Sequence, residues 1–204
     1  MIELKPSKKE EVEVAVPLIY SSGPPTFEYV FKNKQVVAPD FLKYAFVREG
    51  GEFSYQNHYS LYQDGQMVGI GSVFNAKEAS AFTIVDALNI FRFYGLKSFP
   101  TIKFGLKVEK MIKLPKGNEI AIAHLGIARE FRGQGLGTKM MDLLKERANK
   151  TADSYWVLDV SEENLKAKAL YDRLGFKTTQ KHISRLKNQF SYVANHFRME
   201  LREG

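Results

Sequence analysis

Residues 125–138 read LGIAREFRGQGLGT and form the most informative segment of the chain. An apolar strand ends at Ile127, a short link follows, and the glycine-rich turn RGQGLG at 132–137 opens a helix. The N–H groups of a first helical turn have no partner inside the helix, and the helix dipole favours an anion beside them. Glycine lets such a backbone approach a phosphate closely, and Arg132 adds a charged donor. The stretch therefore predicts a site for a pyrophosphate.

Taken alone, the glycine turn is a weak signal. It contains neither the Gly-Lys-Ser/Thr of a Walker loop nor a G-x-G-x-x-G fingerprint. The alternative interpretation is a tight structural turn that starts a helix and packs closely on its neighbours. A second motif is needed to favour one interpretation over the other.

The second motif follows the next predicted strand, Trp156 to Val160. Asn164, Ala167 and Tyr171 share one face of the helix that comes after it, at i, i+3 and i+7. Asn164 offers an amide donor and acceptor, and the Tyr171 phenol can give a proton and take it back. The competing interpretation of Tyr171 is a core aromatic residue whose hydroxyl is satisfied. Together, the two motifs favour a ligand site.

At these two motifs the chain resembles the GNAT superfamily of acyl-CoA-dependent N-acyltransferases. The turn at 132–137 matches the family signature (Arg/Gln)-x-x-Gly-x-(Gly/Ala), and residues 164–176 match the C-terminal helix pattern. Arg129 departs from the pattern, because many members have proline there. The motifs cover about 119–176, and the order of elements extends the resemblance to the whole chain. It implies an N-acetyltransferase that transfers the acetyl group of acetyl-CoA to a primary amine by direct attack.

The resemblance also implies roles for individual residues. Acyl-CoA would occupy a V-shaped opening between the strand ending at Ile127 and the strand at 156–160. Backbone groups near Leu125 and Ile127 would pair with the pantetheine arm and polarise the thioester carbonyl. Asn164 would contact that arm, and Tyr171 would protonate the departing thiolate. Backbone N–H groups of 134–138 would bind the pyrophosphate within a cradle formed by Arg132, Gly133, Gln134, Gly135, Leu136, Gly137 and Thr138.

The general base is less clearly marked, and two residues are candidates. The family often places a glutamate eleven residues before the signature arginine, where this chain has Ala121. Glu119 lies two residues earlier on the same strand face. Strict alternation puts His124 on the opposite face, and its ordinary pKa suits proton transfer near neutral pH. The alternative interpretation of Glu119 is a solvated acid at the edge of a strand. The alternative interpretation of His124 is a core histidine whose hydrogen bonds are satisfied.

The remaining elements predict an α/β (α+β) chain built around one sheet. A strand at 2–5 and several helices precede a hairpin whose turn contains Asp64-Gly65. Helical sequence at about 76–113 precedes the strand Glu119 to Ile127, and final strands are predicted near 176–183 and 196–201. With the resemblance, this order implies a GNAT fold: a single mixed, mostly antiparallel sheet, split around the acyl-CoA site and flanked by helices. We expect 1–204 to form one domain with a helical insertion at about 76–113.

The helical insertion is expected to cover the acceptor side as a wall or lid. The alternative is that its aromatic residues pack a subsidiary core or a homodimer face. An acceptor pocket is expected between the N-terminal helices, the hairpin side and the last strands. Its candidate residues are Tyr20, Ser21, Ser22, Phe27, Tyr29, Phe31, Asn57 and His58.

Composition limits the chemistry that the chain can perform. With no cysteine among 204 residues, disulfides, a cysteine nucleophile, a thiolate zinc site and an iron–sulfur cluster are excluded. The four histidines lie in different predicted elements, so no metal is expected. No secretory or membrane-spanning segment is visible, which predicts a cytoplasmic protein with no membrane partner.

The net charge of +7 does not by itself identify the class of partner that the protein binds. A basic surface favours polyanions, so one alternative is a basic protein associated with nucleic acid or the ribosome. The basic residues are spread along the chain, which makes nucleic acid the weaker interpretation. The other alternative is a non-catalytic module of the same fold that binds acyl-CoA for regulation.

Overall fold

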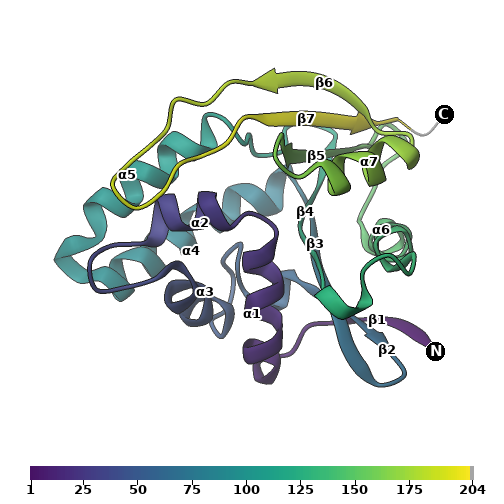
Figure 1. Ribbon diagram of the computed structural model, residues 1–204, viewed down its shortest axis with the longest axis horizontal. Coiled ribbons are helices and arrows are strands. Elements are labelled where there is room, and N and C mark those ends of the chain that lie inside the picture. Colours follow the sequence, from purple (N-terminus) through teal and green to yellow (C-terminus); the bar gives the residue numbers. More distant parts are fainter. Residues whose placement is uncertain (203–204) are drawn as a thin grey trace.

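The computed structural model describes residues 1–202, which form one seven-stranded sheet with helices on both faces (Figure 1). The strands are β1 (Ile2–Pro6), β2 (Tyr59–Gln63), β3 (Gln66–Asn75), β4 (Glu119–Ile127), β5 (Tyr155–Ser161), β6 (Lys177–His182) and β7 (His196–Leu201). The α-helices are α1 (Val12–Ser21), α2 (Pro24–Phe31), α3 (Ala38–Phe46), α4 (Ala76–Tyr94), α5 (Ser98–Glu109), α6 (Leu136–Arg147) and α7 (Leu165–Arg173). Short 3₁₀ turns are η1 (Lys9–Glu11), η2 (Tyr55–Asn57), η3 (Gly95–Lys97) and η4 (Arg129–Phe131).

The sheet has the order β1-β2-β3-β4-β5-β7-β6, and β4–β5 is its parallel pair. The other neighbouring strands are antiparallel, which confirms the predicted mixed, mostly antiparallel sheet. Asp64 and Gly65 take φ angles of 51° and 83° in the hairpin turn between β2 and β3, as the Asp-Gly signal predicts.

Strands β4 and β5 separate soon after they begin. Their register contains three pairs, which are Glu119 with Tyr155, Ile120 with Trp156, and Ala121 with Val157. Beyond these pairs, β4 continues to Ile127 beside β3, and β5 continues to Ser161 beside β7. The backbone groups of β4 that face β5 after Ala121 therefore have no strand to pair with. The sheet is split at its centre, as the fold class predicts.

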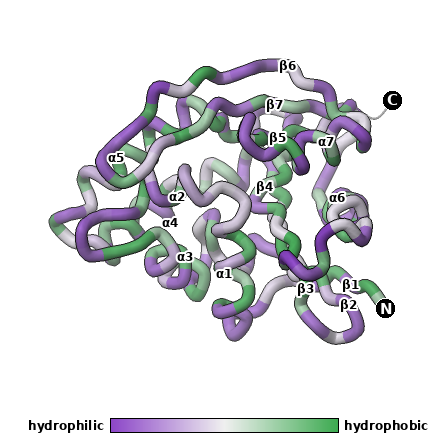
Figure 2. Tube along the Cα trace, in the orientation of Figure 1, coloured by the Kyte–Doolittle hydropathy of each residue, from purple (hydrophilic) through white to green (hydrophobic). Residues whose placement is uncertain are grey.

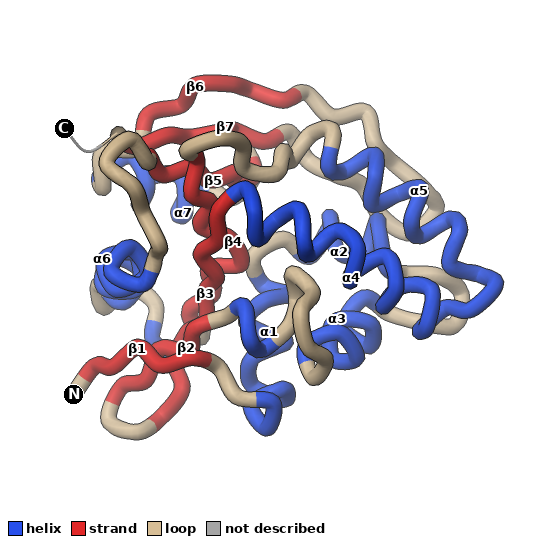
Figure 3. Tube along the Cα trace, turned by 180° about the vertical axis from the view of Figure 1, so that it is seen from behind, coloured by secondary structure: helices blue, strands red, loops and turns tan. Residues whose placement is uncertain are grey.

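Helices cover both faces of the sheet, and each face has its own core. Helices α1–α5 lie on one side of β3 and β4, whereas α6 and α7 lie on the other (Figures 1 and 3). Buried residues of α1, α2 and α3 form the first core around Phe41, and buried residues of α6 form the second around Met140 and Trp156. The central strands carry hydrophobic residues, whereas β6 is mostly hydrophilic (Figure 2). This polarity suits β6 as an edge strand, because charged edges resist pairing with other chains.

A β-bulge in β4 changes the predicted face of His124. Ile70 pairs with Gly126 and Ser72 pairs with Ala123, so Gly71 alone opposes both His124 and Leu125. His124 occupies the left-handed region with φ of 54°, which is costly for a residue with a side chain. Its ring therefore lies with the aromatic residues of the α1–α5 side instead of sharing the face of Ile120 and Ile122. The prediction from strict alternation was wrong because it assumed an unbroken pleat.

The helical sequence at 76–113 forms α4, η3 and α5. Ile84, Leu88 and Phe91 show the helical spacing expected of a buried stripe, yet their exposed fractions are 68%, 48% and 55%. The buried face of α4 instead contains Ala79, Phe82, Asn89 and Tyr94. Within residues 1–202, no helix combines the length and the apolar character that crossing a membrane requires.

Gly126 is required by the close approach of α1 to β4. A Cβ atom at position 126 would lie 2.3 Å from the Leu18 carbonyl oxygen, and backbone cannot move aside as a flexible side chain can. We expect Gly126→Ala to lower the free energy of unfolding by about 1–3 kcal/mol, the usual cost of overpacking. Denaturant unfolding measures this effect.

The matched control is Gly105→Ala in α5, where the nearest atom to an added Cβ is a Val30 methyl 4.0 Å away. This substitution should leave stability unchanged or raise it by about 0.5–1 kcal/mol, because alanine favours a helix over glycine. Equal effects of the two substitutions would contradict the proposed contact.

Candidate active site

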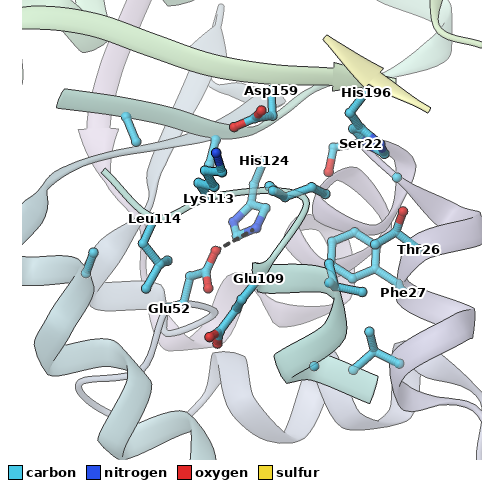
Figure 4. A pocket seen from close by; sticks show the side chains of 18 of the residues that line it. Ser22, Thr26, Phe27, Glu52, Glu109, Lys113, Leu114, His124, Asp159 and His196 are labelled. Atoms are coloured by element: carbon cyan, nitrogen blue, oxygen red, sulfur yellow. Dashed lines mark ion pairs between the residues drawn. The ribbon is translucent and has the colours of Figure 1, made fainter. Parts of the chain in front are cut away.

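A cavity of about 360 Å³ opens where β4 and β5 separate. The α1–α2 junction, α2, the loop of Glu52, α4 and α5 contribute to one part of its wall, and β4, β5, β7 and α7 contribute to another. Aromatic residues, among them Phe27, Phe53 and Phe82, supply much of the apolar lining. Figure 4 shows His124 near the middle of this cavity, with Asp159 to one side and Glu52 and Glu109 to the other.

The glycine-rich turn lies at the end of β4 and has the conformation that glycine permits. Gly133 and Gly135 take φ angles of 80° and 79°, and a Cβ atom at either position would meet no heavy atom within 4 Å. Lys139 N–H donates to the Gly135 carbonyl in the first turn of α6. The N–H groups of Leu136, Gly137 and Thr138 precede this bond, so they have no partner within the helix. The turn thus has the open space and the donors that a phosphate needs.

Side chains of the turn are hydrogen-bonded to the end of β4 and to the 3₁₀ turn η4. Arg132 Nε donates to the Ile127 carbonyl at 2.8 Å, and Gln134 Nε2 donates to the Glu130 carbonyl at 3.3 Å. Leu125 lines the cavity, whereas Ile127 and the residues of 132–138 lie beyond its lining. Strand β4 therefore connects the cavity to the turn along one continuous backbone.

The second sequence motif reaches the same cavity. Tyr171 and Asn164 both line it, and Tyr171 is 8% exposed. Burial raises the pKa of Tyr171 to about 12, so its phenol keeps its proton at neutral pH. Asn164 caps α7 by accepting a hydrogen bond from Ala167 N–H at 3.2 Å, which leaves its NH₂ group as the donor that it can present.

The two motifs also contact each other directly. A Cβ atom at Gly137 would lie 3.0 Å from a Leu170 methyl group, so α7 packs against the first turn of α6. This contact places the glycine turn and the helix of Tyr171 side by side. The structure therefore brings together the two motifs that the sequence presents more than thirty residues apart.

His124 lines the cavity and belongs to a chain of hydrogen bonds. Its Nδ1 lies 3.1 Å from Nε2 of His58, and His58 Nδ1 lies 2.8 Å from the Ser54 carbonyl oxygen. Burial lowers the pKa of His58 to about 4 and, together with the neighbouring His58, lowers the pKa of His124 to about 3. Both imidazoles are therefore neutral near pH 7.

Glu52 lies beside His124 and was not singled out from the sequence. Its Oε1 is 3.4 Å from His124 Nε2, as the dashed line in Figure 4 marks. Burial, reinforced by the nearby Asp86 and Glu109, raises the pKa of Glu52 to about 8. A carboxyl group with this pKa can accept a proton and release it near neutral pH. No motif marks Glu52, because the loop between α3 and η2 reaches the cavity only in the folded chain.

The loop that contains Glu52 is anchored to α4. Glu52 N–H lies 3.0 and 3.2 Å from the two carboxylate oxygens of Asp86. A Cβ atom at Gly51 would lie 2.4 Å from Asp86 Oδ1, so a side chain at position 51 would displace the Asp86 carboxylate. Burial is the main cause that raises the pKa of Asp86 to about 7. Helix α4 thus positions Glu52 and adds a second carboxyl group to the cavity.

Glu119, the other candidate base, lies outside the lining of the cavity. Its Oε2 accepts from Arg198 Nη2 at 2.7 Å, and the Tyr155 hydroxyl donates to its Oε1 at 3.2 Å. Arg198 also contacts Asp159 at 2.6 Å, so it joins the two acids at the base of the split. This geometry favours a structural role for Glu119 and disfavours it as the general base.

The candidate acceptor residues divide into two groups. Ser22, Phe27 and Phe31 line the cavity. The other five lie outside the lining: Tyr20, Ser21, Tyr29, Asn57 and His58.

Among residues 1–202, no group of three or more histidine, aspartate or glutamate side chains has an arrangement that could hold a metal ion.

Comparison with known proteins agrees with this architecture. A 66-residue stretch is 35% identical to the uncharacterized N-acetyltransferase YobR of Bacillus subtilis (strain 168). That stretch spans 32% of this chain and 27% of the relative, so the matched part covers about a quarter of the relative's length.

Two solved structures share the fold over nearly the whole chain. An N-acetyltransferase from Staphylococcus aureus Mu50 has a TM-score of 0.69 at 16% identity, covering 98% of this chain and 100% of that one. The protein yncA of Salmonella typhimurium, solved with its cofactor acetyl-CoA, has a TM-score of 0.55 at 12% identity, covering 99% and 94%.

The sequence profile of the Acetyltransferase (GNAT) family matches residues 24–176, which include the glycine turn, the split strands and Tyr171. This match covers most of the chain and agrees with the fold and with both motifs. The protein therefore belongs to the GNAT acetyltransferase family.

Proposed function

We propose that this protein is an N-acetyltransferase that transfers the acetyl group of acetyl-CoA to a primary amine by direct attack. The observation that carries the proposal is the cavity at the β4–β5 split. It has Tyr171 and Asn164 on one wall and the Glu52–His124 pair on another, and β4 leads from it to the glycine turn.

The residues present fit acetyl-CoA as a cosubstrate. The turn at 132–138 offers unpaired N–H groups and open space to a pyrophosphate, with Arg132 beside it. The backbone of Leu125 to Ile127 offers groups to the amides of the pantetheine arm, because β5 has already separated from β4 there. Asn164 supplies an amide donor at the same opening.

The acceptor side of the cavity is acidic. Glu52, Asp86 and Glu109 line it from the loop after α3, from α4 and from α5. A primary amine is mostly an ammonium ion at neutral pH; those of these groups that are ionised attract it, and both their charged and neutral forms can accept a hydrogen bond from it. An amine acceptor is therefore favoured over a neutral hydroxyl compound.

Proton transfer in the proposed reaction uses Glu52, His124 and Tyr171. The Glu52 carboxylate takes one proton from the ammonium group, and the neutral His124 accepts a hydrogen bond from the carboxyl group that results. The amine nitrogen then bonds to the acetyl carbon, the carbon–sulfur bond breaks, and Tyr171 gives its proton to the leaving thiolate. The second proton of the nitrogen replaces the one lost by Tyr171, and Glu52 releases its proton to solvent.

Two other functions remain as alternatives that experiments separate. A non-catalytic acyl-CoA-binding module would bind acetyl-CoA and transfer nothing, and it would tolerate loss of the Tyr171 hydroxyl. A nucleic-acid-associated protein, suggested by the net charge of +7, would bind nucleic acid in a salt-dependent manner. The Glu52–His124 pair in the cavity favours an enzyme over a regulatory module and over a nucleic-acid-associated protein.

The phosphate cradle is tested by Gly135→Glu, which places a carboxylate at the start of α6. We expect this substitution to weaken acetyl-CoA binding at least about tenfold in calorimetric titration, or about 1.4 kcal/mol. The matched control is Gly65→Glu, because Gly65 has nearly the same φ (83° against 79°) and is equally open. Equal binding by the two variants would place the phosphates elsewhere.

The base is tested by the pH dependence of kcat/KM with a fixed acceptor. Glu52 accepts a proton only when ionised, so activity should rise with pH and reach half its maximum near pH 8. Glu52→Gln should remove this limb and lower kcat about 10²-fold. Glu146→Gln, on the exposed face of α6, should keep the wild-type profile. An unchanged profile in Glu52→Gln would exclude Glu52 as the base.

The acid is tested by Tyr171→Phe, which removes the hydroxyl and keeps the buried ring. We expect kcat to fall about 10²-fold, while calorimetry shows unchanged acetyl-CoA binding. Wild-type kcat in this variant would remove Tyr171 from the mechanism. Acetyl-CoA binding without any transfer in the wild type would instead support the regulatory module.

A further inference from the structure

His58 is a buried histidine that the proposed mechanism does not use directly. It is 0% exposed and lies behind His124, outside the lining of the cavity. Both of its ring nitrogens are nevertheless engaged, one with the Ser54 carbonyl and the other with His124. A buried residue with two such contacts beside a candidate catalytic histidine can determine whether that histidine directs an N–H group or a lone pair into the cavity.

The hydrogen bonds determine which nitrogen carries each proton. The Ser54 carbonyl can only accept, so His58 Nδ1 must be the donor across their 2.8 Å contact. A neutral imidazole has one N–H group, so His58 Nε2 is an acceptor. Across the 3.1 Å contact, His124 Nδ1 must then be the donor. His124 Nε2 is left with a lone pair, and this nitrogen faces Glu52 at 3.4 Å.

The hydrogen bond to His58 and the aromatic contacts of His124 favour one orientation of its ring. The imidazole planes of His124 and His58 lie within 14° of each other with centroids 5.3 Å apart, as expected when the 3.1 Å N···N hydrogen bond lies in both ring planes. The His124 ring also contacts Phe53, with centroids 5.2 Å apart and an angle of 27°. The bulge in β4, with φ of 54° at His124, sets the direction in which the side chain leaves the backbone.

We propose that His58 is a positioning residue that holds His124 in its Nδ1–H tautomer, so that His124 meets Glu52 with a lone pair instead of an N–H group. This inference rests on the proposed function of the Glu52–His124 pair. It assigns His58 a role that requires no contact with acetyl-CoA or with the acceptor.

The tautomer determines how strongly Glu52 holds its proton. A lone pair on His124 Nε2 accepts a hydrogen bond from the protonated carboxyl group and therefore favours that form. An N–H group in the same place would donate to the carboxylate and favour ionisation. His58 thus makes Glu52 a stronger base through His124. The other titratable or charged groups that line this cavity are Asp86 of α4, Glu109 of α5, Lys113, Asp159 of β5, Tyr171 of α7, and His196 and Arg198 of β7.

Nitrogen-15 NMR of the full-length protein tests the tautomer without any activity measurement. Long-range proton–nitrogen correlations distinguish protonated from unprotonated ring nitrogens, and single substitutions assign the four histidines. We expect His124 to carry its proton on Nδ1 in the wild type. His58→Phe removes both hydrogen bonds while keeping a ring, and should shift His124 toward the Nε2–H tautomer.

Two further variants keep the test decisive. His58→Gln can place an amide oxygen near the former Nε2 and should restore the Nδ1–H tautomer. His182→Gln, in β6 and outside the cavity lining, should leave His124 unchanged. An Nε2–H tautomer in the wild type would overturn the proposal even if His58→Phe does not fold. An unchanged His124 tautomer in a folded His58→Phe variant would also overturn it.

Kinetics supply a second readout that a purely structural role would not change. In His58→Phe the half-maximal pH of kcat/KM should move to lower values, and kcat at high pH should fall about tenfold or more. KM for acetyl-CoA should stay unchanged, and His58→Gln should recover the wild-type profile. If no amine is acetylated at all, the proposed function fails, while the NMR result still decides the role of His58.

Discussion

The separation of β4 from β5 creates the space that every other part of the candidate site surrounds. A paired strand satisfies its backbone groups on both sides, and three residue pairs satisfy β4 and β5 only as far as Ala121 and Val157. Beyond that point the two strands lie on either side of a cavity, each still held by its outer neighbour. The Arg198 side chain, bonded to Glu119 and Asp159, joins the strands just where they begin to part. The opening is therefore set by the hydrogen-bond pairing of the sheet itself.

A second constraint is the bulge opposite Gly71. It costs about 1–3 kcal/mol to hold a residue such as His124 in the left-handed region, and the surrounding packing must supply that energy. The bulge turns His124 toward Phe27 and Phe53, while Leu125 remains with the opposite core. This single bulge thus directs the His124 imidazole into the cavity. Beyond the bulge, β4 continues to Ile127, just before the glycine turn.

Helices α4 and α5 give the cavity its acidic side. Asp86 and Glu109 come from these helices, and Asp86 also anchors the loop of Glu52. The same elements expose Leu96 and Phe99, at 97% and 75%, at the turn between them. The segment therefore contributes to the site through its inner face, whereas periodicity alone predicted only that it would be helical.

From the residues alone, the family and the order of the elements could be predicted, and so could a candidate cofactor side for the site. These features are local: a glycine turn with its φ angles, a helix start and a cap such as Asn164 are encoded within a few residues. The proposed acid–base side emerges only in the folded chain. Glu52, His58 and His124 come from segments up to 72 residues apart, and the bulge that orients His124 depends on the register with β3. The alternation of residues along a strand does not reveal where a bulge interrupts it. The raised pKa of Glu52 results from burial and from the nearby Asp86 and Glu109, which lie close to Glu52 only in the folded chain.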